Sequence, residues 1–223
     1  MTEAFYTSLG RYVMRTDEYG YEYPVVISNE NEHILTAEEF MVWMTFLWNI
    51  YQPDEVEAAY VRDMTSTGIH PANCFCDIFE RLEVRGLIAC GQGITKVDAL
   101  YDLLAGLTVI SCVPSGRSKI KAAFYLLFRR VPLRRVVAVF KKQFLTTEES
   151  STLQYIKGAA MTTKALIQTV EVDTLDCEVP CGKAPEKPHL PPASWPVLQI
   201  VANLYLKKCI VLDKFVLRQQ ALP

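Results

Sequence analysis

Apolar positions recur along the chain at a spacing that predicts mostly helices. The clearest start signal is LTAEEF, residues 35–40, in which Thr36 and Glu39 form a capping box and the first and last residues form a hydrophobic staple. The apolar run that follows carries aromatic side chains around much of its circumference, as expected for a central core helix. We expect this helix to begin near Ala37 and to end just before Pro53.

Two further helices are expected after the first. Pro53, followed by two acidic residues, favours a helix start, and this second helix ends near Gly68. A third helix is expected over Pro71–Arg85, with Gly86 as its C-terminal stop. Its buried face, at the spacing i, i+3, i+4 and i+7, is formed by Phe75, Ile78, Phe79 and Leu82.

Short strands are expected after the third helix. GLIAC is strand-like, GQG (residues 91–93) is expected to be a turn, VDALYDLLAG a small helix, and LTVISCV a second β-rich run. This order resembles the winged-helix version of the helix-turn-helix family. The resemblance is carried by Asp54–Thr65, the turn STGIHP, Pro71–Arg85 and GLIACGQG, and it covers residues 36–113. It implies a third helix that lies in the major groove of DNA.

The outward face of this third helix does not suit DNA. It is centred on Asn73, Asp77, Glu80 and Val84, with Arg81 at its flank. A face with two carboxylates and no basic side chain would repel the phosphates, which receive most protein–DNA contacts. The candidate contact residues are therefore Asn73, Asp77, Glu80 and Arg81. The domain can have the shape of a DNA reader without reading DNA through this helix, and the same shape also serves for docking proteins.

Charge is unevenly distributed along the chain. The net charge is −2, but the stretch between Asp102 and Glu148 has no acidic residue and contains nine of the 23 basic ones. The remaining sequence holds 14 basic and 25 acidic residues. Such an asymmetry indicates the chemistry of a partner and carries no information about the fold.

The basic stretch contains PLRRVVAVFKKQFL, which begins at Pro132. As a helix this segment separates an apolar stripe from a cationic face, whereas as a strand VVAVF would mix charge with core. The candidate residues for binding nucleic acid or an acidic partner are Arg129, Arg130, Arg134, Arg135, Lys141 and Lys142. Four interpretations of this face compete: nucleic acid, an anionic membrane surface, an acidic protein, or pairing with the chain's own carboxylates.

The second half of the chain is α-rich. TTEESSTLQYIKG and WPVLQIVANLYLKK are expected to be helices, MTTKALIQTVEV is a helix or a strand, and CIVLDKFVL contains a strand signal. Residues 176–193 contain five prolines and are interpreted as a loop or linker. We therefore predict a mainly α protein with a minor β part. Residues 1–113 form a winged-helix-like domain with an N-terminal extension, and residues 114–223 form a helical domain.

No catalytic signature is present. The chain has three histidines, no phosphate-binding loop and no nucleophile-elbow motif. Cys177, Cys181 and His189 have a spacing that is not typical of a zinc site, so we predict no metal and no cofactor. The seven cysteines are an odd number and several lie in apolar runs, which favours free thiols in the cytoplasm. No apolar stretch suits a transmembrane helix, which needs about 20 residues.

These features predict a cytoplasmic, non-enzymatic regulatory protein that binds nucleic acid, with phosphate contacts from the basic helix. The alternative is an adaptor or assembly subunit that binds proteins through the winged-helix scaffold and does not bind DNA. Either function is compatible with a homo- or hetero-oligomer.

Overall fold

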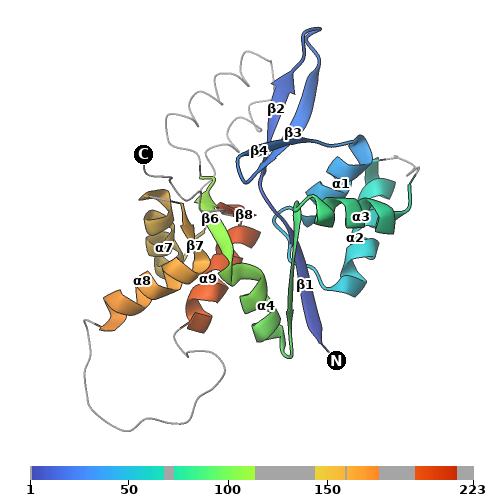
Figure 1. The fold of residues 1–223 in the computed structure, drawn as a ribbon. Helices are drawn as coiled ribbons and strands as arrows, with labels where there is room; N and C mark the ends of the chain where they lie inside the picture. Colours follow the sequence, from blue (N-terminus) through green and yellow to red (C-terminus); the bar gives the residue numbers. More distant parts are fainter. Residues whose placement is uncertain (1, 68–72, 114–143, 159, 176–193, 215–223) are drawn as a thin grey trace, which may run out of the picture.

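The computed structural model describes residues 2–67, 73–113, 144–158, 160–175 and 194–214. Across these ranges it has seven helices and three small antiparallel sheets (Figure 1). The fold is therefore α+β, and the prediction of a mainly α protein is wrong. The main source of the error is the N-terminal segment, which was given no structure and forms four strands: β1 (Glu3–Ser8), β2 (Arg11–Thr16), β3 (Glu22–Ser28) and β4 (Asn31–Ile34).

Strands β2, β3 and β4 form one antiparallel sheet with β3 in the centre. Asn29 and Glu30 join β3 to β4 and have φ angles of 49° and 62°, as in the type I′ turns of tight hairpins. Between β2 and β3, Asp17 Oδ1 accepts hydrogen bonds from the N–H groups of Tyr19 and Tyr21 at 3.0 and 2.8 Å. Two local turns therefore determine the register of this sheet.

The strand pairing after α3 differs from that of a wing. β5 (Ile88–Gly93) pairs antiparallel with β1, near the N-terminus. β6 (Leu107–Ser111) pairs with β7 (Met161–Thr162) on one side and with β8 (Ile210–Lys214) on the other. Because β5 and β6 do not pair with each other, these residues do not form the strand, turn and returning strand that the winged-helix resemblance implied.

Glycines in β5 allow α4 (Lys96–Ala105) to pack closely against the strand. A Cβ atom on Gly91 would lie 2.3 Å from the backbone nitrogen of Leu103, and one on Gly93 would lie 2.3 Å from that of Ala99. Real Cβ contacts are never this short, so only glycine permits this approach. The sequence GQG is therefore part of a strand and not the turn that was predicted.

The first three helices begin much as predicted but one ends early. They are α1 (Ala37–Phe46), α2 (Pro53–Thr67) and α3 (Phe75–Val84). α1 was expected to continue to Pro53, but Trp48 has a φ of 60° and the chain leaves the helix. Tyr51 then exchanges backbone hydrogen bonds with Tyr6 of β1, at 2.9 and 3.0 Å. Pairing with β1, a strand that was not predicted, thus replaces the last turns of the helix.

The end of α3 and its buried face agree with the sequence. Gly86 has a φ of +70°, and the backbone N–H of Leu87 donates to the carbonyl oxygen of Leu82, which closes the helix as predicted. Ile78 and Leu82 are fully buried, in one cluster with α1 and α2. Phe75 and Phe79 are partly buried against the same cluster.

A second core joins the two halves of the chain. The helices of the second half are α7 (Thr147–Gly158), α8 (Thr163–Leu175) and α9 (Ser194–Leu206). Leu9 and Leu104 share one buried cluster with Leu166, Leu198 and Tyr205. The boundary expected at residue 113 therefore lies at the end of a strand whose sheet and core contain residues from both sides. In the described ranges, no helix has the length and apolarity needed to cross a membrane.

Candidate protein-docking surface on helix α3

The predicted basic surface lies in a part of the chain that the structure does not describe. All six candidate cations, Arg129, Arg130, Arg134, Arg135, Lys141 and Lys142, lie outside the described residues. The same holds for Cys177, Cys181 and His189. Of the candidate residues, the structure therefore places those on and beside α3.

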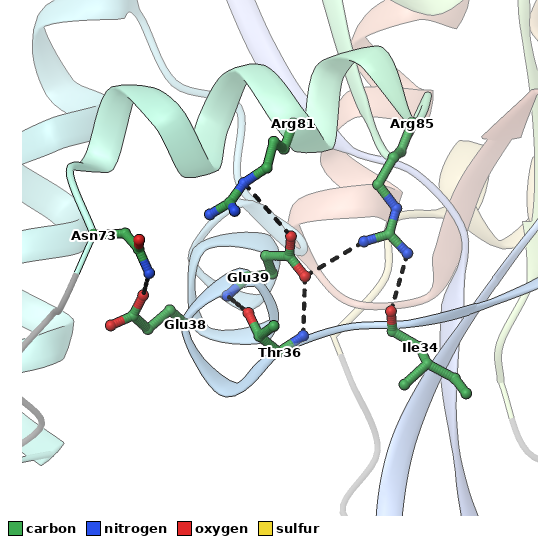
Figure 2. A network of polar contacts seen from close by, with 7 residues as sticks. All are labelled: Ile34, Thr36, Glu38, Glu39, Asn73, Arg81 and Arg85. Carbon is green, nitrogen blue, oxygen red and sulfur yellow. Dashed lines mark hydrogen bonds and ion pairs between the residues drawn. The ribbon is translucent and has the colours of Figure 1, made fainter.

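Arg81 of α3 and Arg85, directly after it, form ion pairs with a buried carboxylate of α1. Arg81 Nε lies 3.7 Å from Glu39 Oε1, and Arg85 Nη1 lies 3.4 Å from Glu39 Oε2. Arg85 Nη2 also donates to the carbonyl oxygen of Ile34 at 3.0 Å. Figure 2 shows both guanidinium groups pointing from α3 towards the start of α1. These contacts tie α3 to α1 and to the end of β4.

Glu39 is held at the same time by its own helix. Its Oε2 accepts the backbone N–H of Thr36 at 2.9 Å, and its backbone N–H donates to Thr36 Oγ1 at 3.2 Å, so the predicted capping box is confirmed. Only 8% of the Glu39 side chain is exposed. Burying a carboxylate is unfavourable unless it is paired and hydrogen-bonded, which explains why both guanidinium groups lie beside Glu39.

Asn73 is also used inside the molecule. Its Nδ2 donates to Glu38 Oε2 at 2.6 Å, so this residue connects the start of α3 with the start of α1 (Figure 2). Of the four predicted residues, Asn73 and Arg81 therefore make internal contacts with α1. These partners were not predicted, because they lie 35 and 42 positions away in the chain.

Asp77 and Glu80 remain on the outward face of α3. Both are exposed, and neither forms an ion pair within the part of the chain that the structure describes. Val84, one turn further along the same face, is 82% exposed. The outward face of α3 therefore presents two carboxylates and an apolar side chain to solvent.

Two cysteines lie beside this face, and the surroundings of Cys76 disfavour its thiolate. Cys74 and Cys76 are exposed and free. The interaction with Cys74 is the largest cause that raises the pKa of the Cys76 thiol, and the carboxylates of Glu57 and Asp77 raise it further. A raised pKa disfavours the thiolate, which is the nucleophilic and metal-binding form. Among the described residues, no group of three or more His, Cys, Asp or Glu side chains is arranged to hold a metal ion.

Comparisons with known proteins assign the chain to no family. No protein-family model, no curated protein and no solved structure matches the chain.

Proposed function

We propose that the protein is a non-enzymatic interaction module that docks a cationic protein surface on the outward face of α3. The observation that carries this proposal is the division of charge on α3. Its arginines bind Glu39, whereas Asp77 and Glu80 face solvent without an ion-pair partner among the described residues. The proposal keeps the protein-binding role of the adaptor alternative but does not depend on a winged-helix scaffold.

The chemistry of this face favours a protein over nucleic acid. Carboxylates repel the phosphate backbone, which dominates nucleic-acid affinity. They attract lysine and arginine side chains of a protein partner, where complementary charge raises the association rate and specificity. The exposed Val84 adds apolar area, which charged residues alone do not offer.

A capture experiment with the full chain tests this function. Wild type and the variant Asp77→Asn/Glu80→Gln are immobilised, and bound proteins are quantified by mass spectrometry. A matched control, Glu18→Gln/Glu148→Gln, removes the same two charges from exposed positions on other elements. We expect a stoichiometric partner that the wild type and the control retain and that the α3 variant loses by at least about tenfold, or about 1.4 kcal/mol. A partner retained equally by all three proteins contradicts docking through this face.

Nucleic-acid binding through the basic segment is the second candidate. It is supported by the sequence, in which nine basic residues and no acidic one occur between Asp102 and Glu148. The affinity for duplex and single-stranded DNA should then fall steeply with salt, and changing Arg134, Arg135, Lys141 and Lys142 to serine should flatten the slope. Absence of binding at about 50–100 mM salt, where phosphate contacts are strong, rules this candidate out.

A further inference from the structure

Within the described ranges, one edge of the sheet β2-β3-β4 has no strand paired with it. β2 is the terminal strand, and no described strand pairs with its outer side (Figure 1). The Tyr12 and Met14 side chains are 42% and 52% exposed, and Thr16 is exposed as well. An exposed edge strand with free N–H and C=O groups is a template for pairing with another strand.

The hydrogen-bond pattern shows which residues of β2 face this edge. The backbone N–H of Asp17 donates to the carbonyl oxygen of Tyr21 at 3.0 Å, so Asp17 is hydrogen-bonded towards β3. In an antiparallel pair the bonded residues alternate, and Arg11, Val13 and Arg15 therefore bond towards β3 as well. The N–H and C=O groups of Tyr12, Met14 and Thr16 point to the open side. In agreement, the N–H of the preceding even residue, Gly10, bonds away from β3, to Leu212 at 2.7 Å.

We propose that two copies of the chain associate through their β2 strands. The strands pair antiparallel about a two-fold axis at Met14 and join the two three-stranded sheets into one of six strands. This association is independent of the function proposed for α3. It uses backbone hydrogen bonds of β2, whereas that function uses side-chain charges of α3.

The charges of β2 select one register for this pairing. Only an even-numbered residue can bond to an even-numbered residue of the second copy, because the other residues bond inward. If the Met14 residues of the two copies lie opposite each other, Tyr12 of one copy lies opposite Thr16 of the other, and Arg11 lies opposite Asp17. Each Arg11 then faces a carboxylate of the second copy, at a non-hydrogen-bonded position where side chains are closest.

The neighbouring registers are disfavoured by repulsion. A shift of the second strand by two residues in one direction places Arg11 opposite Arg15 of the other copy. A shift by two residues in the other direction places the Arg15 residues of the two copies opposite each other. Like charges directly opposite each other destabilise a strand pair. In the favoured register no two arginines lie directly opposite, and within each chain Arg15 is already paired with Glu32.

Apolar side chains support the same register. Tyr12 and Met14 lie on one face of the sheet, where the Tyr12 ring packs against Phe40 and Trp43 at centroid distances of 5.8 and 6.4 Å. Pairing at Met14 joins the two apolar rows into one continuous stripe across the two-fold axis. An isologous contact of this kind is self-complementary and closes at two copies.

Sedimentation analysis of the full chain tests the association. A six-residue strand pair buries less than the roughly 1,200 Å² of a typical stable interface, so we expect a concentration-dependent dimer between about 10 μM and 1 mM. Met14→Pro removes an outward N–H and no bond to β3, so it should leave the chain folded and monomeric. Met14→Ile keeps the N–H and should dimerise. A wild type that stays monomeric at the highest concentration, or a Met14→Pro variant that still dimerises, overturns the proposal.

Disulfide cross-linking tests the register. Met14→Cys should form a covalent dimer on mild oxidation, because residue 14 faces its own copy. Thr16→Cys faces Tyr12 of the second copy and should give no more dimer than wild type, which reports the background from native cysteines. Stronger cross-linking of Thr16→Cys than of Met14→Cys contradicts the proposed axis. A monomer in every arm leaves the edge open to a strand of a different protein and overturns self-association.

Discussion

Thr7 and Tyr205 are 198 positions apart in the sequence, and Thr7 Oγ1 donates a buried hydrogen bond of 2.8 Å to the phenolic oxygen of Tyr205. The same oxygen accepts the backbone N–H of Trp48 at 2.9 Å. Trp48 has a positive φ, which is uncommon for a residue of this size and must be held by its surroundings. Tyr205 therefore connects β1, the end of α1 and α9 at one atom.

Tyr205→Phe tests this connection. The change deletes the oxygen and leaves the partly buried N–H of Trp48 without this partner. We expect the free energy of unfolding, measured by urea denaturation, to fall by about 1–3 kcal/mol. Tyr21→Phe removes a hydroxyl from an exposed tyrosine and should change the stability by less than about 0.5 kcal/mol. Equal effects of the two changes would contradict a special role of the Tyr205 oxygen.

Glu39→Gln separates the charge of Glu39 from its capping role. Glutamine can still accept the N–H of Thr36, since glutamate and glutamine both serve in capping boxes. It cannot neutralise Arg81 and Arg85, so we expect a loss of about 1–2 kcal/mol in the free energy of unfolding. Glu80→Gln, on the outward face of α3, should leave stability within about 0.5 kcal/mol of wild type. If Glu39→Gln left the free energy of unfolding unchanged, the stability would not depend on the charge of this carboxylate.

Local signals in the sequence predicted helix starts well and strand partners poorly. The capping box at Thr36 and the stop at Gly86 depend on residues close in sequence, and both are present. The pairing of β1 with β5 joins residues about 85 positions apart, which no spacing pattern reveals. The Asn29-Glu30 turn lacks the glycine that usually marks such hairpins, so the N-terminal sheet was missed.

The candidate site was predicted in part for the same reason. Helical periodicity correctly separated the outward Asp77 and Glu80 from the buried Ile78 and Leu82. The role of Arg81 was missed, because its partner Glu39 comes from another helix. The unpaired edge of β2 could not be inferred without knowing that residues 11–34 form a three-stranded sheet.

Gly91→Ala tests the close packing of α4 on β5. The added Cβ would meet the backbone of Leu103, which cannot move as a flexible side chain can. We expect the free energy of unfolding, measured by thermal or urea denaturation, to fall by about 3 kcal/mol or more, which is the upper end for overpacking. Gly106→Ala is the matched control, since a Cβ there meets nothing within 4 Å and the change should be neutral or stabilising by up to about 1 kcal/mol. A tolerated Gly91→Ala would disprove this contact.

Glu30→Gly tests the turn between β3 and β4. Glu30 has a φ of 62°, a conformation that glycine adopts freely, and Asn-Gly is the preferred pair in type I′ turns. We expect the free energy of unfolding to rise by about 0.5–1 kcal/mol, because the backbone strain is relieved. Glu22→Gly, in the extended strand β3, should have the opposite sign and a similar size. Destabilisation by Glu30→Gly would indicate a different turn.

Glu149→Gln tests how an ion pair between α7 and the end of α9 makes stability depend on pH. Burial acts to raise the pKa of Glu149, but Lys207 Nζ, at 2.6 and 2.7 Å from the two carboxylate oxygens, and the N–H of Thr146 outweigh it and lower the pKa below its ordinary value near 4.5. A lowered pKa in the folded state gives stability that is complete above the ordinary value and is lost as the pH falls through the lowered one.

At pH 7 we therefore expect Glu149→Gln to lower the free energy of unfolding by about 1–2 kcal/mol, the modest value expected because Lys207 is partly exposed. The difference from wild type should shrink as the pH is lowered from about 5 to 3, where the wild-type carboxylate takes up its proton. Glu148→Gln, its exposed neighbour on α7, should follow the wild-type pH profile. A Glu149→Gln deficit that stays constant down to pH 3 would mean that packing, and not the charge of Glu149, stabilises the contact between α7 and α9.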